Sequence, residues 1–446
     1  MPRHPHLLFV FGDQWRSQAT GYAGDPNVKT PSIDRFAAES VVFTNAVSGC
    51  PVCSPWRASL MTGRYPHRHG MVTNDQCLAE LSDGPFFAEV LGSAGYHTAY
   101  IGKWHLAGHG RAKYVPTGRR LGFETWLGYE CNHDYWKGFY YSEGKEKRIW
   151  EGYDARAQTD AACRIIREHS GERPLALFLS WGPPHAPYLT APEEYRALYD
   201  PGDIILRANV PPEAEADARR DLAGYYAHCS ALDECFGDLL AAVDDAGMAD
   251  DTVVVFTSDH GDMLGSRGQW KKQRPYEESI SVPLVIRDPG ASGGLSVETV
   301  IDTPDLMPTL LALAGIRPPA EVQGRDLSAV LRGEDPAPDG DALIASYLPF
   351  HQWKRSVGGR EYRGLRTERH TYVRDLQGPW LLYDNDADPL QQSNLVADPG
   401  CAELVESLDV RLTQRLAELG DDFLPAAEYV ERFRIRLDGD GDVFYE

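Results

Sequence analysis

Short runs of β-branched and aromatic residues alternate with helix-length amphipathic stretches along most of the chain, and this alternation limits the fold more than any other feature. Runs of the strand type occupy residues 7–12, 41–47, 96–102, 175–181, 252–258 and 282–286. Patterns of the helical type begin at residue 30 and cover residues 85–95, 155–170, 219–247 and 304–315. Strands separated by helices predict an α/β fold in which a largely parallel sheet lies between helical layers.

A polar stretch rich in Pro and Gly, residues 333–341, interrupts this pattern. Shorter strand-type runs follow near residues 343–346, 363–366, 371–374 and 381–383, before a helical pattern over 401–419. Turn-forming composition of this kind is typical of a boundary. We therefore predict a catalytic domain over residues 1–340 and a smaller C-terminal α+β subdomain with a short antiparallel sheet over residues 341–446.

The charge balance excludes one class of function. The 446 residues include 44 Lys and Arg against 66 Asp and Glu, which gives a net charge of −22. A nonspecific nucleic-acid binder needs basic residues to neutralise phosphates, so no nucleic-acid partner is expected. An anionic substrate would have to be bound by a local group of positive charges.

Apolar patterning and cysteine content predict where the protein works. No apolar run approaches the roughly 20 residues that cross a bilayer, and the run at residues 7–11 is shorter than the core of a secretion signal. We therefore expect a cytoplasmic protein without membrane association. Eight cysteines are too few for a disulfide scaffold, so most are expected to be reduced, buried thiols.

Residues capable of chemistry follow several of the predicted strands. They are Asp13 and Gln14, Lys103 and His105, His185, and Asp259 with His260. Open α/β sheets place their sites beyond the carboxyl ends of the strands, so these clusters are expected to meet there. A single polar cluster after a strand is more often an ordinary loop, but four such clusters in one chain favour a site.

The run Cys-Ser-Pro-Trp-Arg-Ala-Ser-Leu-Met-Thr-Gly over residues 53–63 carries Cys, Pro, Arg and a closing Thr-Gly at the positions of the sulfatase signature. Four further motifs follow in the family's order: Gly102-Lys103-Trp104-His105, Pro184-His185-Ala186-Pro187, Ser258-Asp259-His260-Gly261 and Lys272 with Tyr276-Glu277. On these residues the chain resembles the type I sulfatases of the alkaline-phosphatase-like superfamily. The resemblance implies a three-layer sandwich around a largely parallel sheet.

Cys53 is the residue for which the resemblance implies the most specific role. In the family, a formylglycine-generating enzyme oxidises this cysteine to formylglycine, whose hydrated aldehyde attacks sulfur and later expels sulfate. The start of the helix predicted over residues 55–62 would favour negative charge at this position, so a plain thiolate nucleophile is also chemically reasonable. The simplest alternative is that Cys53 is a buried thiol with only a structural role.

The resemblance also implies a divalent metal. The family's metal positions correspond to Asp13, Gln14, Cys53, Asp259 and His260. Oxygen ligands suit calcium, which is our expectation, while manganese and magnesium stay open because an imidazole softens the site. Many relatives have a second Asp where Gln14 stands and Asn where His260 stands, so this arrangement is more similar to the phosphonate monoester hydrolase and choline sulfatase branches.

The resemblance implies the remaining catalytic roles for individual residues of this chain. Arg57 resembles the arginine that steadies the nucleophile, Lys103 the lysine that binds sulfate, and His105 the histidine that assists collapse of the diol. His185 and Lys272 resemble the pair that binds the bridging oxygen and protonates the leaving group. Asn74 is a further candidate for contact with sulfate. Each of these residues taken alone could be an ordinary polar group.

The predicted activity is hydrolysis of a sulfate monoester, from an aryl sulfate or a sulfated carbohydrate, to an alcohol and sulfate. The main alternative is a phosphonate monoester or phosphodiester hydrolase on the same scaffold, although those relatives have threonine where this chain has Lys103. A two-zinc phosphatase and a catalytically inactive binding homologue fit the residues less well. Alkyl sulfates and the oligomeric state stay open.

Three other features have simpler interpretations. The aromatic stretch 129–153 is predicted to be either a substrate rim or a packed subdomain or oligomer contact, with no preference. The acidic run over residues 438–442 lacks the spacing of a calcium loop and is expected to be a turn. His67 and His69 are expected to have loop roles.

Overall fold

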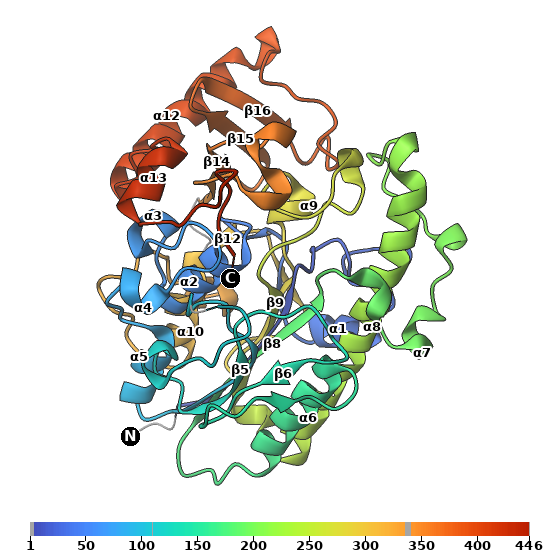
Figure 1. Cartoon of the computed structure of the whole chain (residues 1–446), viewed down its shortest axis with the longest axis vertical. Helices are drawn as coiled ribbons and strands as arrows, with labels where there is room; N and C mark the ends of the chain where they lie inside the picture. Colours follow the sequence, from blue (N-terminus) through green and yellow to red (C-terminus); the bar gives the residue numbers. More distant parts are fainter. Residues whose placement is uncertain (1–3, 109, 335–339, 446) are drawn as a thin grey trace.

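The computed structural model describes residues 4–108, 110–334 and 340–445 (Figure 1). Within these residues an eight-stranded sheet has the order β11-β2-β10-β9-β1-β8-β4-β5. The central strands β9, β1, β8, β4 and β5 run parallel, and β10 is antiparallel to both of its neighbours. In sheet order the strands are Leu295–Val297, Val41–Phe43, Leu284–Arg287, Thr252–Ser258, His6–Asp13, Leu175–Pro184, His97–Lys103 and Thr125–Tyr129.

Helices cover both faces of this sheet, as Figure 1 shows. Leu8 and Val10 of β1 join one core cluster, with α1 (Pro31–Ala38), α6 (Asp154–Arg167) and α8 (Glu215–Asp245). The alternate residues Phe9 and Phe11 join the other, with α2 (Cys53–Thr62), α5 (Phe87–Ser93) and α10 (Leu306–Leu313). Every residue of β1 is buried, as expected of a strand covered on both faces. The predicted three-layer α/β sandwich is confirmed.

One predicted strand is wrong in its extent. Residues 41–47 form two short strands, because the chain turns at Thr44 and Asn45 and leaves the large sheet. The Thr44 backbone N–H and the Asn45 side chain donate to the backbone oxygens of Val297 and Glu298, which fixes this turn. After it, β3 (Ala46–Val47) pairs with β12 (Ile301–Asp302) in a separate two-stranded sheet.

The C-terminal part contains the predicted antiparallel sheet. Its strands are β13 (Ala342–Ser346), β14 (Tyr362–Arg366), β15 (His370–Asp375) and β16 (Gly378–Asp384), in that order. Helix α12 (Ala402–Leu419) packs Leu408, Leu412 and Leu416 against this sheet. Part of the predicted boundary, residues 335–339, lies outside the described residues, and the division at residue 340 stays a prediction.

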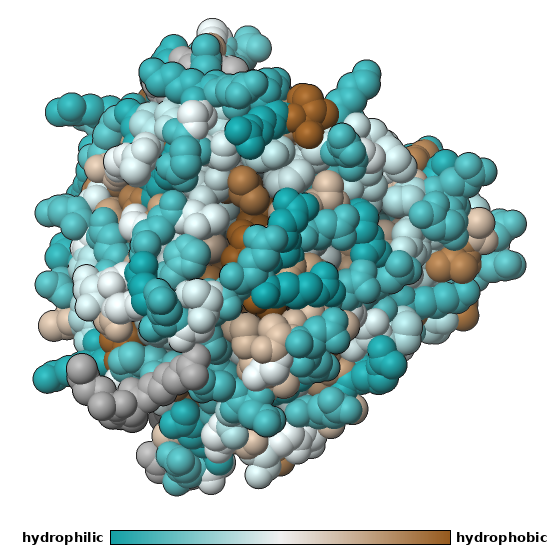
Figure 2. Space-filling model, turned by 90° about the horizontal axis from the view of Figure 1, so that it is seen from below, coloured by the Kyte–Doolittle hydropathy of each residue, from teal (hydrophilic) through white to brown (hydrophobic). Residues whose placement is uncertain are grey.

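The surface and the helices agree with the hydropathy of the sequence. None of the helices in the described ranges has both the length and the apolar composition needed to cross a membrane. On the face seen in Figure 2, hydrophilic residues predominate and apolar residues form only small patches.

Candidate active site

The predicted strand-end clusters meet at one edge of the large sheet. Asp13 ends β1 and Lys103 ends β4, while Asp259 follows β9 directly and His185 follows β8. These four strands are parallel neighbours in the order β9-β1-β8-β4. Their carboxyl ends therefore bring four side chains, distant in sequence, into the crevice where open α/β sheets carry their sites.

Cys53 lies beside this edge as the first residue of α2, and it is only 2% exposed. The backbone N–H of Ser54 donates to Asn74 Oδ1 at 3.0 Å, and the Ser54 hydroxyl donates to the backbone oxygen of His105 at 2.7 Å. These contacts hold the first turn of the helix in place. The dipole of that turn favours negative charge at Cys53.

Basic side chains surround the sulfur of Cys53. Lys272 Nζ lies 3.4 Å and Lys103 Nζ lies 3.8 Å from Cys53 Sγ, and His260 Nε2 lies 3.2 Å away. Burial and the neighbouring Asp13 oppose ionisation, yet the two lysines and His260 hold the pKa of the Cys53 thiol well below its usual value. This position is therefore suited to a group that carries negative charge.

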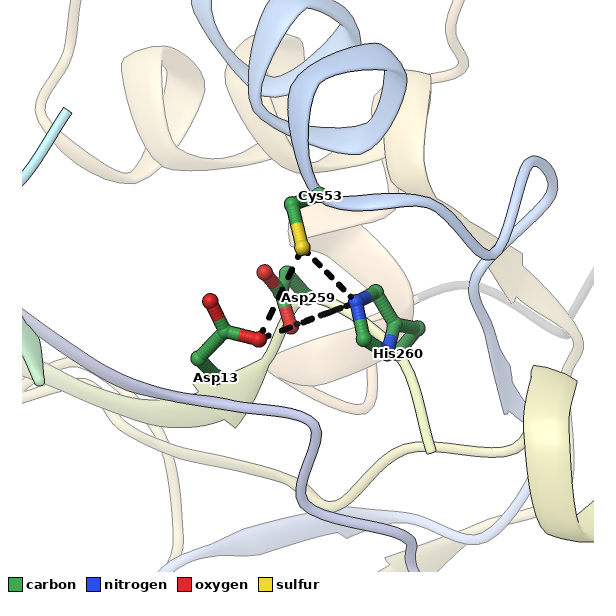
Figure 3. A group of neighbouring side chains, drawn as sticks. All are labelled: Asp13, Cys53, Asp259 and His260. Atoms are coloured by element: carbon green, nitrogen blue, oxygen red, sulfur yellow. Dashed lines mark hydrogen bonds and ion pairs between the residues drawn. The ribbon is translucent and has the colours of Figure 1, made fainter. Parts of the chain in front are cut away.

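Four potential metal ligands converge at the same place. One ligand atom from each of Asp13, Cys53, Asp259 and His260 lies within 4.8 Å of the others, and Figure 3 shows the side chains pointing toward one another. His260 Nε2 is 3.5 Å from Asp259 Oδ1 and 3.8 Å from Asp13 Oδ1. The other ring nitrogen, Nδ1, lies 3.0 Å from the backbone oxygen of Gly261, so Nε2 is the nitrogen that faces the cluster.

Gln14 adds an amide oxygen beside this cluster. Its backbone N–H donates to Asp259 Oδ1 at 2.9 Å, and its Oε1 accepts a hydrogen bond from Lys272 Nζ at 2.8 Å. Two carboxylates, an amide oxygen and an imidazole nitrogen form a donor set that fits a divalent cation. Over the described ranges, no other group of three or more His, Cys, Asp or Glu side chains converges in this way.

Buried lysine and arginine side chains form ion pairs with the carboxylates of this cluster. Lys103 Nζ donates to Asp13 Oδ2 at 2.5 Å, and Arg57 Nη2 lies 3.5 Å from Asp13 Oδ2 and 3.2 Å from Asp259 Oδ2. Burial favours the neutral form of Asp13, but Lys103, Lys272 and Arg57 hold the pKa of this carboxyl well below its usual value. Asp13 is therefore a carboxylate at neutral pH.

The two predicted catalytic histidines differ in charge. Burial lowers the pKa of His105, but Cys131 and Asp75 outweigh it and raise the value to about 9. Burial and the cation of Lys272 hold the pKa of His185 well below its usual value. At neutral pH the His105 ring is thus protonated and the His185 ring is neutral.

All eleven side chains predicted for the site are buried, and the structure brings them together around Cys53. The set comprises Asp13, Gln14, Cys53, Arg57, Asn74, Lys103, His105, His185, Asp259, His260 and Lys272. Asn74 and His185 are the most exposed of them, at 7% each. These two side chains therefore lie nearest to solvent.

The sequence reasoning missed several residues that contact this set. Asp75 accepts from His105 Nε2 at 3.1 Å and from Arg111 Nη2 at 2.9 Å. The Arg111 guanidinium lies 3.7 Å from the centre of the Tyr445 ring, whose hydroxyl accepts from Asn74 Nδ2 at 3.4 Å. The ring of His133 stacks on His185 with centroids 4.1 Å apart. Two of them had a signal in the sequence: Asp75 follows Asn74, and His133 lies in the stretch 129–153 that was a candidate for a substrate rim.

Most aromatic side chains of the stretch 129–153 are packed inside the protein, while residues 143–149 are exposed. Tyr129, Phe139 and Tyr141 form a small buried cluster, and the Tyr135 hydroxyl donates to the backbone oxygen of His185 at 2.6 Å. Trp136 is the exception, with 48% of its surface exposed. Of the two alternatives, the structure favours packing for most of these aromatic side chains, and the Tyr135 hydroxyl supports the loop that carries His185.

The structure corrects one of the simpler interpretations and agrees with another. His67 and His69 lie in the short helix α3 (Pro66–His69) and not in a loop. His67 contacts the Tyr347 hydroxyl and the backbone oxygen of Leu419, and His69 contacts Ser59. The acidic run 438–442 forms a turn in which the Asp438 side chain accepts two backbone N–H groups. All eight cysteines are free thiols, so the Cys50 and Cys53 pair forms no disulfide.

Comparisons with known proteins match nearly the whole chain. The family model described as Sulfatase matches residues 5–316, and the model described as N-sulphoglucosamine sulphohydrolase, C-terminal, matches residues 265–418. An ulvan-active sulfatase of Formosa agariphila is 43% identical over 441 residues, which cover 97% of this chain and 85% of that protein.

Solved structures show the same fold. One, from work on the metabolism of multiple glycosaminoglycans by Bacteroides thetaiotaomicron, has a TM-score of 0.85 at 28% identity and covers 97% of this chain and 99% of its own. The phosphonate monoester hydrolase of Agrobacterium radiobacter has a TM-score of 0.75 at 24% identity, with 99% of this chain and all of that chain covered. At this low identity, the second match shows only that the two proteins share a fold.

Proposed function

The chain belongs to the sulfatase family and is a sulfuric ester hydrolase, and on that basis we propose that it releases sulfate from a sulfated carbohydrate through a modified Cys53. The relatives support the substrate class, because one is named for its activity on ulvan and another comes from work on glycosaminoglycan metabolism. The substrate is an anion, and the site meets it with Arg57, Lys103 and Lys272 although the whole chain carries a charge of −22.

The nucleophile of the proposal is formylglycine, made from Cys53 by a formylglycine-generating enzyme. As a hydrate it would supply two hydroxyl groups on one carbon, one to attack sulfur and the other to let the sulfated residue expel sulfate and regenerate the aldehyde. The surroundings of Cys53 support this, since Lys103, Lys272 and His260 favour negative charge at the attacking atom. Below its pKa of about 9 the protonated His105 is proposed to donate a hydrogen bond to an oxygen of the diol, and only its neutral form could accept the proton that the second hydroxyl releases in the collapse.

The metal of the proposal is calcium, held by Asp13, Gln14, Asp259 and His260 together with the modified residue 53. A bound divalent ion would stabilise negative charge on the attacking group and on the sulfate oxygens. Two carboxylates and two neutral side chains match the charge of a divalent ion.

Lys272 and His185 are proposed to act on the leaving group. Both approach the acidic cluster from the side of β8 and the loop after β9, and the pKa of His185 is lowered by burial and by Lys272. The ring of His185 is therefore a neutral hydrogen-bonding group in the free enzyme, and the Lys272 ammonium is the member of the pair that carries the proton. Asn74 Nδ2 and Lys103 Nζ are proposed to bind sulfate oxygens.

One observation carries the proposal: Cys53 of the sulfatase signature begins α2, and the side-chain nitrogens of Lys103, Lys272 and His260 lie within 3.2–3.8 Å of its sulfur. We predict that coexpression with a formylglycine-generating enzyme produces the mass loss of formylglycine in the peptide 51–64. Cys53→Ala should lower kcat for p-nitrophenyl sulfate at least about 1,000-fold. Peptide mass spectrometry and steady-state kinetics measure both effects.

Cys50→Ala is the matched control, because it removes the buried cysteine three positions before Cys53. It should leave the modification and kcat within about threefold of the wild type. Full activity of Cys53→Ala, or activity of a protein whose residue 53 stays an unmodified thiol, would contradict the mechanism.

A phosphonate monoester or phosphodiester hydrolase is the second candidate. Gln14 and His260 favour it, since this ligand pair is similar to that branch, while Lys103 fits the sulfatase pattern instead. Parallel assays with p-nitrophenyl sulfate and p-nitrophenyl phenylphosphonate separate the two. We expect the higher kcat/KM on the sulfate, and the reverse order would favour the second candidate.

A further inference from the structure

The side-chain amide of Gln14 is held in one orientation by hydrogen bonds on both of its ends. Its Oε1 accepts from Lys272 Nζ at 2.8 Å, and its Nε2 donates to Asp262 Oδ2 at 2.5 Å. A flipped amide would place an NH₂ group against an ammonium and an oxygen against a carboxylate, both repulsive. The oxygen of Gln14 therefore faces Lys272, whose ammonium also lies 3.4 Å from Cys53 Sγ of the metal cluster, and the nitrogen faces Asp262.

Asp262 is itself fixed from all sides and is fully buried. Its Oδ1 accepts the backbone N–H groups of Leu264 at 3.1 Å and Lys271 at 2.7 Å. Its Oδ2 accepts from Gln14 and from the Tyr188 hydroxyl at 2.5 Å. Tyr188 cannot reverse its bond easily, because the same hydroxyl receives a hydrogen bond from Lys271 Nζ at 2.9 Å. Both oxygens of this carboxylate thus face donors.

We propose that Asp262 is the positioning residue that orients the Gln14 amide, so that its oxygen and not its nitrogen is presented to the metal. Asp262 also gives a physical reason for an amide at position 14. A glutamate there, which has the length of Gln14, would face the Asp262 carboxylate at contact distance inside the protein, and such a buried pair is strongly unfavourable. The inference rests on the proposed metal site.

The isosteric substitution Asp262→Asn tests the orientation. The two backbone N–H groups require an oxygen at the Oδ1 position, so the new NH₂ group must face Gln14. Gln14 then has to turn its oxygen toward residue 262 and its nitrogen toward the metal. We expect the dissociation constant of calcium, measured by isothermal titration calorimetry on metal-stripped protein, to rise about 10–100-fold.

The double variant Gln14→Glu/Asp262→Asn should restore binding. The carboxylate introduced at position 14 has the shape of the glutamine amide but accepts with both oxygens. One oxygen can take the NH₂ group introduced at position 262 while the other faces the metal. We expect the calcium dissociation constant of this double variant to lie within about threefold of the wild type. A merely structural role of Asp262 would not be rescued by this second change.

Tyr188→Phe is the control, because it removes the other donor to Asp262 Oδ2 without touching Gln14. It should leave calcium affinity within about twofold of the wild type. The melting temperature of each metal-free variant, and its rise with added calcium, report folding and binding independently of any ester hydrolysis.

The outcomes separate the two proposals. Wild-type affinity in Asp262→Asn, or a double variant as weak as that single variant, would overturn the role of Asp262 alone. A wild-type protein that binds neither calcium, magnesium nor manganese would overturn the proposed metal site and the role of Asp262 with it.

Discussion

Cys50 and Cys53 lie three positions apart, but their surroundings give the two thiols opposite acidities. Burial raises the pKa of Cys50 to about 12, whereas Lys103, Lys272 and His260 hold the pKa of Cys53 well below its usual value. Cysteines in electropositive surroundings react as thiolates, and cysteines in apolar surroundings are inert. The chemistry of residue 53 is therefore set by the side chains around it rather than by the spacing of the pair.

His105 depends on a neighbour in the same way. Its Nε2 lies 3.1 Å from Asp75 Oδ1, and Cys131 and Asp75 together raise its pKa to about 9 against the effect of burial. The ring keeps its proton below that pH and loses it above. In Asp75→Asn we expect the pKa of His105 to fall by about 1 unit, because a neutral partner stabilises the imidazolium less.

This change should appear in the pH profile of kcat/KM for p-nitrophenyl sulfate. The alkaline limb should move to lower pH by about 1 unit, because His105 is deprotonated earlier, while the acid limb stays in place. Glu80→Gln, which removes an exposed carboxylate paired with Arg119, serves as the control and should leave the profile unchanged. If the alkaline limb does not move in Asp75→Asn, deprotonation of His105 is not the cause of that limb.

At the scale of elements, the close approach of β4 and β8 positions two of the proposed site residues. The parallel register pairs Gly102 with Ser180, whose hydroxyl accepts from Arg57 Nη1 at 2.7 Å, and Lys103 follows directly. Gly102 has φ +100°, and a Cβ atom there would lie 2.0 Å from the backbone oxygen of Ser180. Only glycine allows this backbone conformation and this approach together.

We predict that Gly102→Ala lowers the free energy of unfolding by about 2–4 kcal/mol, because the new methyl group separates the two strands. The same shift should displace Lys103 and lower kcat. Urea unfolding and steady-state kinetics measure the two effects.

Gly92→Ala provides the comparison, since Gly92 lies in α5, where an added Cβ atom would meet no atom outside the helix backbone within 4 Å. There the change should be neutral or stabilise by up to about 1 kcal/mol. Equal stability of the Gly102 and Gly92 variants would refute the packing argument.

At the scale of the whole molecule, a buried ion pair inside the C-terminal part lies where His67 of the N-terminal part meets the C-terminal sheet. Arg363 of β14 donates to both oxygens of Asp421, at 2.6 and 3.1 Å, and neither side chain is exposed. His67 of α3 (Pro66–His69) lies 3.6 Å from Asp421, and Tyr429 of α13 (Ala426–Arg432) accepts from Arg363 at 2.8 Å. One carboxylate thus lies between three parts of the fold.

We predict that Asp421→Ala lowers the free energy of unfolding by about 3–5 kcal/mol, because it leaves the buried Arg363 without its partner. Arg363 outweighs burial and lowers the pKa of Asp421 to about 2. A lowered carboxyl pKa stabilises the fold above the unfolded value near 4 and loses that effect as the pH falls through about 2. The difference between wild type and variant should therefore shrink over this range.

Denaturant unfolding at several pH values measures this difference. Asp422→Ala is the control, because Asp422 is exposed and pairs with Arg432 only at 3.7 Å. It should change stability by no more than about 0.5 kcal/mol at any pH. A similar small change in Asp421→Ala would mean that the buried pair does not hold the parts together.

Most of the layered fold could be predicted from the sequence because its strands and helices are long and strongly patterned. The run 252–258 matches β9 residue for residue, and the helix expected over 401–419 is α12 to within one residue. Residues 41–47 could not be resolved into two strands. Their pattern is continuous, and the turn depends on contacts with Val297 and Glu298, which are 253 positions away.

The sequence by itself determined the fold class, the family signature around Cys53 and the chemical types placed after the strands, because these depend on local pattern and on the topology of a parallel sheet. Only the tertiary structure decided the charge of those groups and the orientation of Gln14. Asp75 acts on His105, and Asp262 on Gln14, through contacts between side chains 30 and 248 positions apart. Hydrogen bonds and charges act over a few ångströms of space, and a linear pattern does not show which side chains come that close.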